Sequence, residues 1–267
     1  MLKKNIKPKK SLGQNFLKDE NVAKKIVAAL SIKPDDFVLE IGAGTGVLTK
    51  YLVHSGATVI AVEIDKNLFK ILENEFPDQK NVTLYQEDFL KLSFKEILGD
   101  SKGWKVIGNL PYVITSPVLF KIFESSFFFD KAVFMMQKEV AQRIAATPNS
   151  KEYGILSIQS QYYADVKKLF DVSRNVFFPV PEVTSSVVEF VFKQNSELNK
   201  SEERIFRHVV RKVFSQRRKM LRNSLKTVTD FEINLDQLNF DLKQRPEQLT
   251  VSEFINLSKQ IAILQRA

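Results

Sequence analysis

The sequence has 267 residues, of which 44% are apolar and 27% charged, so it has the length to bury a full core and the composition of a globular protein. It contains no cysteine, which excludes disulfides, thiolate catalysis and cysteine-based metal sites, and its two histidines make a zinc site unexpected. No apolar signal segment follows the start, and the longest uncharged stretch, 106–120, is too short to span a bilayer. We therefore expect a cytoplasmic protein with no metal and no membrane partner.

The net charge of +9 is concentrated in two segments. Residues 1–18 carry six lysines and residues 204–226 carry nine Lys or Arg, and neither segment contains an acidic residue. The rest of the chain has 25 basic and 31 acidic residues. Basicity confined in this way favours a directed contact with a polyanion, although each segment alone could also be a solvated face or a frayed tail.

In chain order, residues 1–10 predict a flexible basic arm, and 20–30 predict a helix. From residue 37, short apolar runs alternate with amphipathic segments, which predicts an α/β fold with a doubly wound, mostly parallel sheet whose ligands bind at the carboxyl ends of the strands. The predicted strands are 37–41, 58–62, 82–85, 105–107 and 132–136, and the predicted helices are 47–55, 66–75, 91–98 and 115–125.

A glycine-rich turn, residues 40–46 (Glu-Ile-Gly-Ala-Gly-Thr-Gly), follows the first of these strands. Glycine lets the backbone approach a ligand closely at the start of a helix. The turn is not a P-loop, because no Gly-Lys-Ser/Thr follows, and it lacks the dinucleotide spacing because Val47 stands where the third glycine would be. It resembles the cofactor loop of S-adenosylmethionine-dependent methyltransferases; a purely structural turn is the alternative.

Two acidic residues follow the next strands. Glu63 ends its strand seventeen residues after Gly46, where a carboxylate can accept hydrogen bonds from both hydroxyls of a ribose. Asp88 can accept a hydrogen bond from an adenine amine or cap a helix, whereas Asp65 is more simply a helix cap. Asn15, by its spacing alone, is a turn or capping residue.

The tetrapeptide Asn109-Leu110-Pro111-Tyr112 follows the fourth strand and is suited to methylating an amine. The exocyclic amine of adenine is a poor nucleophile because its lone pair is delocalised, so acceptors must draw its two protons out of the ring plane. Asn109 offers a side-chain carbonyl and Leu110 a main-chain carbonyl, Pro111 fixes the backbone, and Tyr112 supplies a stacking face. The target base must be unpaired or flipped out of a helix.

These motifs together resemble those of the rRNA adenine dimethyltransferase family of the small ribosomal subunit, and the similarity covers nearly the whole chain. Val113 departs from the family, in which a polar residue commonly follows the tyrosine. The matching stretches are 13–17, 42–46, 109–112, 137–140, 175–191 and 216–225.

The resemblance implies a seven-stranded, Rossmann-like methyltransferase sheet and dimethylation of two adjacent adenosines near the 3′ end of 16S rRNA, with S-adenosyl-L-methionine as the methyl donor. Asn109 would bridge cofactor and target, and Phe177, by composition one of 22 phenylalanines in the chain, would stack on the target base opposite Tyr112. The implied cofactor-binding residues are Asn15, Leu17, Gly42, Gly44, Glu63, Asp88 and Asn109.

The C-terminal part predicts a small α-helical domain. We expect a basic arm at 1–18, a catalytic domain at 19–195 and a helical, RNA-contacting domain at 196–267. A basic amphipathic helix can bind RNA or a membrane surface, and the methylase motifs upstream favour RNA. Arg217 is an exception within the apolar face, and we expect it to be paired or to contact the catalytic domain. The expected RNA-binding residues are Arg207, Arg211, Arg218, Lys219 and Arg222.

Two alternatives stay open. The chain could be a macrolide-resistance-type adenine methylase of large-subunit rRNA, although the 216–225 match favours the small-subunit enzyme. It could also be a non-catalytic assembly or transcription factor on the same fold, against which the intact Gly42, Glu63 and Asn109 argue. We expect the 16S rRNA of the small subunit or its precursor as partner, and a monomeric protein.

Overall fold

The computed structural model describes residues 7–77, 79–226 and 234–265 and divides the chain into two compact units. The first, here called the sheet unit, comprises the chain up to Ala141 together with Asp165–Phe192. The second, the helical unit, comprises Gln142–Ala164 and the chain from Lys193 onward. The sequence placed the boundary near residue 195, so segment 142–164, which the sequence assigned to the catalytic domain, groups with the C-terminal helices instead.

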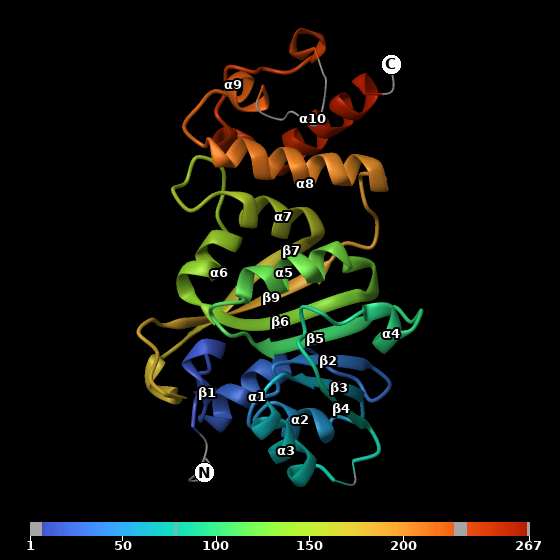
Figure 1. Ribbon diagram of the computed structural model, residues 1–267, viewed down its shortest axis with the longest axis vertical. Coiled ribbons are helices and arrows are strands. Elements are labelled where there is room, and N and C mark those ends of the chain that lie inside the picture. Colours follow the sequence, from blue (N-terminus) through green and yellow to red (C-terminus); the bar gives the residue numbers. More distant parts are fainter. Residues whose placement is uncertain (1–6, 78, 227–233, 266–267) are drawn as a thin grey trace. The chain divides into compact units, whose positions relative to one another are not determined.

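The described part of the chain forms a seven-stranded sheet in the order β4-β3-β2-β5-β6-β9-β7, shown edge to edge in Figure 1. The pairings β4·β3, β3·β2, β2·β5 and β5·β6 are parallel, and β9 pairs antiparallel with β6. This confirms the predicted doubly wound, mostly parallel, seven-stranded sheet. The strands are β2 (Phe37–Ile41), β3 (Thr58–Glu63), β4 (Val82–Gln86), β5 (Trp104–Asn109), β6 (Phe129–Gln137), β7 (Ala164–Val172) and β9 (Ser185–Phe192).

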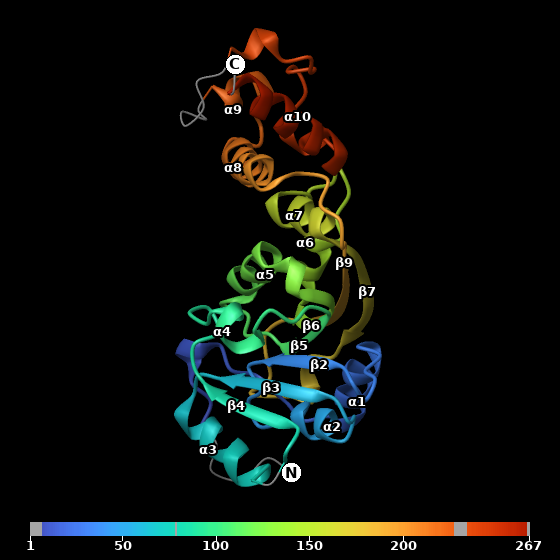
Figure 2. The ribbon, with the colours of Figure 1, turned by 90° about the vertical axis from the view of Figure 1, so that its right-hand side faces the viewer.

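Helices cover both faces of this sheet, as parallel strands buried on both sides require. In the turned view of Figure 2, α1 and α2 lie on one face and α4 and α5 on the other. Helix caps explain two of the starts, because Asp19 accepts from the N–H groups of Asn21 and Val22, and Asp65 accepts from that of Asn67, as predicted for Asp65. The helices are α1 (Glu20–Ala29), α2 (Thr49–Val53), α3 (Lys66–Glu75), α4 (Phe94–Leu98) and α5 (Thr115–Glu124).

A second, two-stranded sheet joins the N-terminal segment to a distant part of the sheet unit. Strand β1 (Phe16–Leu17) pairs antiparallel with β8 (Phe177–Phe178), so Leu17 lies opposite Phe177. Leu17 and Phe177 are both buried in the same apolar cluster as Ile26 of α1. The pairing therefore fixes the N-terminal segment against the carboxyl ends of the main sheet, where the glycine-rich turn lies.

The helical unit is built around a long amphipathic helix, α8 (Lys200–Ser215). An Asn199 cap begins it, accepting from the N–H groups of Ser201 and Glu202. Its apolar face is buried and packs against α7 (Ile155–Tyr163) and α10 (Val251–Leu264), and α9 (Leu221–Leu225) follows it after a turn. The helix α6 (Lys138–Ile144) runs from one unit into the other. The buried residues of α8 are Ile205, Phe206, Val209, Val210 and Val213.

Candidate functional site

A cavity of about 250 Å³ lies within the sheet unit, where β2, β3 and β5 end. Its walls are segments of the N-terminal region, the glycine-rich turn, the residues after β3 and β4, and the tetrapeptide after β5. All of the predicted cofactor-binding residues line it, as do Leu110, Pro111 and Tyr112. Sequence positions far apart therefore meet at the predicted edge of the sheet.

The glycine-rich turn leaves open space where a side chain would otherwise project. Gly42 and Gly44 have φ angles of +68° and +60°, in the left-handed region that favours glycine. A Cβ built on Gly42 would meet no atom within 4 Å. The N–H of Gly42 is bonded to the carbonyl of Val62 at 2.9 Å, so the turn is held against β3 while its cavity side stays unobstructed.

Glu63 is held at the end of β3 by main-chain donors. Its Oε2 accepts from the N–H of Gly44 and its Oε1 from that of Asp65, both at 2.8 Å. Burial raises the pKa of Glu63, and these two hydrogen bonds oppose that rise. A carboxylate has about four lone-pair positions, so the ionised group retains the capacity to accept two hydroxyls from the cavity, which fits the pair of hydroxyls of a ribose.

Glu40, one residue from the end of β2, is a second buried carboxyl at this cavity. It is 1% exposed, and Oγ1 of Thr49 donates to its Oε2 at 2.7 Å. Burial raises the pKa of Glu40 to about 7, and the neighbouring charge of Glu63 adds to the rise. No separate role for Glu40 was predicted from the sequence; the signal that could have marked it is a carboxylate near the end of an otherwise apolar strand.

The N-terminal segment closes one side of the cavity. Its main chain follows Gly13, whose φ is +60°, and the amide of Asn15 donates to the carbonyl of Gly13 at 3.2 Å. Asp65 ties this segment to the end of β3: Nζ of Lys9 lies 3.0 Å from Oδ1 of Asp65, and Nε2 of Gln14 donates to its Oδ2 at 3.1 Å. The predicted flexible arm is in this way attached to the site from Lys9 on, while residues 1–6 lie outside the described residues.

Asn109 has a fixed orientation at the end of β5. One N–H of its Nδ2 donates to the main-chain carbonyl of Asn15 at 3.0 Å, which fixes the orientation of the amide and leaves Oδ1 and the second N–H for a ligand. The N–H of Leu110 donates to the carbonyl of Met135 at 3.0 Å, and the carbonyl of Pro111 accepts from Oγ1 of Thr115. The tetrapeptide is therefore bonded to the neighbouring strand on one side and to the start of α5 on the other.

Tyr112 and Val113 lie at the same edge of the cavity. The hydroxyl of Tyr112 is 2.7 Å from Oγ of Ser185, and burial raises the pKa of this half-buried phenol, so it stays neutral. Val113 is 64% exposed, and one of its methyl groups would lie 3.1 Å from a Cβ at Gly13. The residue that departs from the family pattern thus contacts the N-terminal segment with an apolar side chain.

Phe177 lies in the core of the sheet unit in this structure. It is fully buried, belongs to the apolar cluster around Leu17 and Ile26, and does not line the cavity. Its stacking on a target base stays a prediction, and in this structure the residue pairs with Leu17 of β1. Composition alone had made it a core phenylalanine, and its neighbour Phe178 is the exposed aromatic, at 44%.

Asp88 lies in the turn after β4 and lines the cavity. Its Oδ1 accepts from the N–H of Leu90 at 3.0 Å, which stabilises a turn rather than the start of a helix, because α4 begins only at Phe94. Oδ2 remains as the second acceptor of the same carboxylate.

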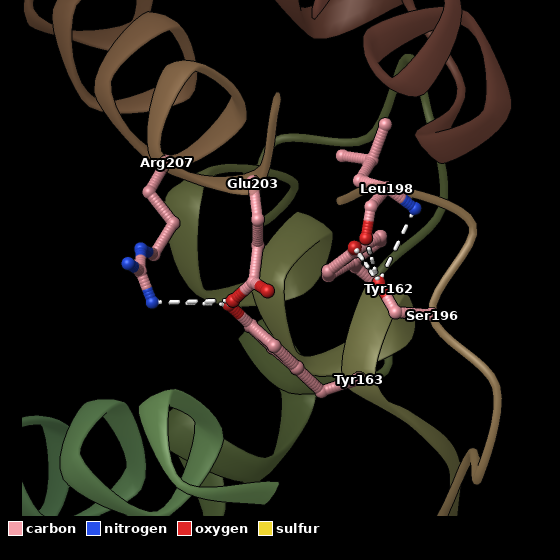
Figure 3. Close-up of polar contacts among 6 residues, drawn as sticks. All are labelled: Tyr162, Tyr163, Ser196, Leu198, Glu203 and Arg207. Atoms are coloured by element: carbon pink, nitrogen blue, oxygen red, sulfur yellow. Dashed lines mark hydrogen bonds and ion pairs between the residues drawn. The ribbon is translucent and has the colours of Figure 1, made fainter. Parts of the chain in front are cut away.

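The basic side chains of the helical unit differ in how far they are already engaged. Arg207 of α8 pairs with Glu203 at 3.2 Å and lies 3.4 Å from the hydroxyl of Tyr163, which itself donates to Glu203 (Figure 3). Nearby, Tyr162 bonds to Ser196. Arg207 is therefore half-buried and contributes to the packing of α7 against α8. A residue that contacts RNA was expected to be more exposed.

Arg217 is paired, as expected, but within its own unit. It donates to Glu247 at 2.5 Å and to the carbonyls of Lys151 and Ser150 at 2.6 and 2.8 Å. The sequence had assigned 150–151 to the catalytic domain, whereas both residues belong to the helical unit. Of the other residues predicted to bind RNA, Arg222 pairs with Asp236 at 2.6 Å, and the side chains of Arg211, Arg218 and Lys219 are exposed.

Within 7–77, 79–226 and 234–265, no group of three or more His, Asp or Glu is placed to hold a metal ion. None of the helices in these ranges is both long and apolar enough to cross a membrane.

Comparison with known proteins identifies the chain. It matches the family of ribosomal RNA adenine dimethylases over residues 5–262. It is 38% identical over 263 residues to ribosomal RNA small subunit methyltransferase A of Clostridium acetobutylicum, covering 97% of this chain and 95% of the relative. It is 45% identical to the protein of the same name in Mycoplasma mobile, with coverages of 92% and 95%.

Solved structures agree with this assignment. A dimethyladenosine transferase from Plasmodium falciparum superimposes with a TM-score of 0.78 at 30% identity, covering 91% of this chain and 95% of that one. A 23S rRNA methyltransferase, ErmE, has a TM-score of 0.69 at 22% identity, with coverages of 92% and 99%, and shares the fold. The chain belongs to the ribosomal RNA adenine dimethylase family.

Proposed function

We propose that this protein dimethylates the 6-amino groups of two adjacent adenosines near the 3′ end of 16S rRNA, acting in the cytoplasm on the small ribosomal subunit or its precursor. Family membership and the relatives named as small-subunit methyltransferases support the substrate. The observation that carries the chemistry is the orientation of Asn109, whose Nδ2 is committed to Asn15 at the edge of the cavity.

The methyl donor is S-adenosyl-L-methionine, which supplies a methyl group activated on a sulfonium. Glu63 would hold its two ribose hydroxyls with the lone pairs that Gly44 and Asp65 leave free. Asp88 would accept a hydrogen bond from its adenine amine. Gly42 and Gly44 let the main chain pass close to the donor, and Asn15 and Leu17 form the wall on the N-terminal side.

The tetrapeptide binds the target amine. Oδ1 of Asn109 and the carbonyl of Leu110 would accept hydrogen bonds from its two N–H groups, which would turn its lone pair toward the methyl group. Tyr112 offers a ring face to the base, and its neutral phenol keeps a second charge away from the site. Catalysis then rests on alignment and on dipoles fixed before the reaction, with no side chain required as a base before attack. The positive charge of the sulfonium would pass to the methylated amine, which then loses one proton to water.

A labelling experiment tests the substrate. The protein is incubated with labelled S-adenosyl-L-methionine and, separately, with undermethylated small subunits and with protein-free large-subunit rRNA, and modified bases are then mapped. We expect dimethylation of two adjacent adenosines near the 3′ end of 16S rRNA. Label only in the large-subunit RNA would instead support the macrolide-resistance-type activity, and no label in either, from protein that binds small subunits, would support a non-catalytic assembly factor.

A further inference from the structure

The turn after β4 forms one wall of the cavity, and its own hydrogen bonds only partly define its shape. Asp88, Phe89 and Leu90 line the cavity. Within the turn, Oδ1 of Asp88 accepts from the N–H of Leu90, and the carbonyl of Asp88 accepts from the N–H of Lys91 at 2.8 Å. The carbonyls of Leu90 and Leu92 are bonded from outside the turn, by a side chain on α5.

That side chain is Lys121. Its ammonium donates to the carbonyl of Leu90 at 2.9 Å and to that of Leu92. The same nitrogen lies 5.4 Å from the centre of the Phe89 ring and 5.3 Å from that of Phe94, close enough for cation–π attraction. Phe89 and Phe94 are each 5% exposed and contact one another, so this cation is held between two buried rings and two carbonyls.

Charge and burial fit a structural cation at this place. Burial lowers the pKa of Lys121, and the nearby charge of Asp88 opposes that change. An ammonium can satisfy two carbonyls and still have a third donor, which a neutral side chain of the same length cannot do. Without it, two half-buried carbonyls would lack their donor, and the turn would rearrange to reach water.

We propose that Lys121 is a positioning residue for recognition of the donor's base: by holding the turn 88–92 against α5, it keeps Oδ2 of Asp88 and the ring of Phe89 where they select adenine. The inference rests on the proposed binding of S-adenosyl-L-methionine in this cavity. Lys121 acts through Asp88 and does not line the cavity itself. Its loss should therefore affect the discrimination of the 6-amino group more than the binding of the rest of the molecule.

The test compares two ligands on purified full-length protein by calorimetry. The first is S-adenosylhomocysteine, the demethylated donor, and the second is its analogue that carries purine without the 6-amino group. The wild type should bind the first at least about tenfold more tightly, because a site built for an amine leaves an acceptor unpaired with the analogue. Lys121→Met should weaken binding of the first ligand about tenfold and of the second less than about twofold, so that the preference falls by about fivefold or more.

Lys105→Met is the matched control. Lys105 is also a largely buried lysine of the sheet unit, 13% exposed, that donates to a main-chain carbonyl, that of Ser31, at 2.6 Å. It lies near the start of β5 and does not line the cavity, so both affinities should match the wild type. If Lys121→Met does not yield folded protein, Lys121→Gln, which keeps a donor but loses the charge, carries the same test and should narrow the preference at least about threefold.

The outcomes separate this inference from the proposed function. An unchanged preference in the Lys121 variants, or equal losses for both ligands, overturns the positioning role, since equal losses would indicate only a weakened fold. If wild-type protein binds neither ligand, the assignment of the cavity to S-adenosyl-L-methionine fails instead.

Discussion

At the residue scale, Asn109 and Glu63 have part of their hydrogen-bonding capacity committed to the main chain, and this determines which atoms remain for a ligand. Asn109 gives one of its two N–H donors to the carbonyl of Asn15, and the carboxylate of Glu63 accepts from two main-chain N–H groups. An amide that could rotate would offer donor and acceptor equally. Fixed as it is, Asn109 presents an acceptor to an amine, which is the polarity that methylation of adenine requires.

Replacing Asn109 tests this polarity. We expect Asn109→Ala to lower kcat by about 100-fold or more, the usual effect of removing one preorganised hydrogen-bonding group, while rRNA affinity stays the same. Asn109→Asp should fail as well, because a carboxylate cannot donate to the carbonyl of Asn15. Single-turnover methylation and filter binding measure the two quantities. More than a tenth of wild-type turnover in Asn109→Ala would exclude the acceptor role.

Because the pKa of Glu40 is raised in the folded protein, this residue makes the free energy of unfolding depend on pH. Its pKa is about 7 in the folded protein and 4.5 as the ordinary value, so between these values the folded chain keeps a proton that the unfolded chain has lost. The contribution of Glu40 to the free energy of unfolding therefore falls as pH rises through this window, by about 3 kcal/mol at most, and is constant above it.

Glu40→Gln isolates this contribution, because glutamine still accepts from Oγ1 of Thr49 but does not ionise. Urea unfolding at pH 5 and pH 8 should show similar stabilities for the two proteins at the lower pH. At the higher pH the variant should be more stable by about 2 to 3 kcal/mol. Equal pH dependence in the two proteins would show that Glu40 does not hold a proton in this window.

At the element scale, the sequence predicted the parallel strands well and the later elements poorly. β2 matches the predicted 37–41, and β3, β4, β5 and β6 extend their predictions by a few residues. Apart from the edge strand β4, these strands have apolar runs that are buried on both faces, and such a run can be recognised from the local sequence alone. Between its buried end residues, β7 has only exposed and half-buried residues, so it gives a weak signal. No residue pattern around 142–164 indicates to which unit that segment belongs. Such grouping depends on contacts distant in sequence.

Gly108 shows how closely the two central strands approach beside the site. A Cβ at this position would lie 2.7 Å from the carbonyl oxygen of Ile41 on β2, a main-chain atom that cannot move without opening the β2·β5 pair. Gly108→Ala should therefore destabilise the protein by about 2 kcal/mol or more and reduce methylation, because Gly42 directly follows β2 and Asn109 is the last residue of β5.

The control for Gly108 is Gly154→Ala. Gly154 has φ near 180°, and its added Cβ would meet only the ring of Phe214, at 3.9 Å, which is ordinary contact. Its unfolding midpoint and activity should stay within error of the wild type. Equal midpoints for both variants would show that the strands can separate at Gly108 without cost.

At the scale of the whole molecule, the charge pattern showed where the basic residues gather, but not which of them are available to RNA. Helical periodicity separated the apolar from the basic side of α8, and the buried residues of α8 confirm that division. It could not reveal that Arg207 meets Tyr163, 44 residues away, or that Arg217 meets Glu247, 30 residues away in a segment without periodicity. Partners that distant are determined by packing rather than by local pattern.

Arg217, Arg218 and Lys219, consecutive in the turn after α8, allow the two roles of basic residues to be separated. Arg218 and Lys219 are exposed, whereas Arg217 donates hydrogen bonds to Glu247 and to two main-chain carbonyls.

The double variant Arg218→Gln, Lys219→Gln should weaken rRNA binding and reduce the slope of log K against log salt concentration by about 1 to 2, since up to two phosphate contacts are lost. Its urea unfolding midpoint should be unchanged. Arg217→Gln should do the reverse, lowering the midpoint because a half-buried carboxylate and two carbonyls lose their donor, while the salt slope stays near that of the wild type. Titrations of a small-subunit rRNA fragment at several salt concentrations, paired with urea unfolding, measure both. An unchanged slope in the double variant would show that Arg218 and Lys219 are only solvated and that the RNA contact lies elsewhere on the chain.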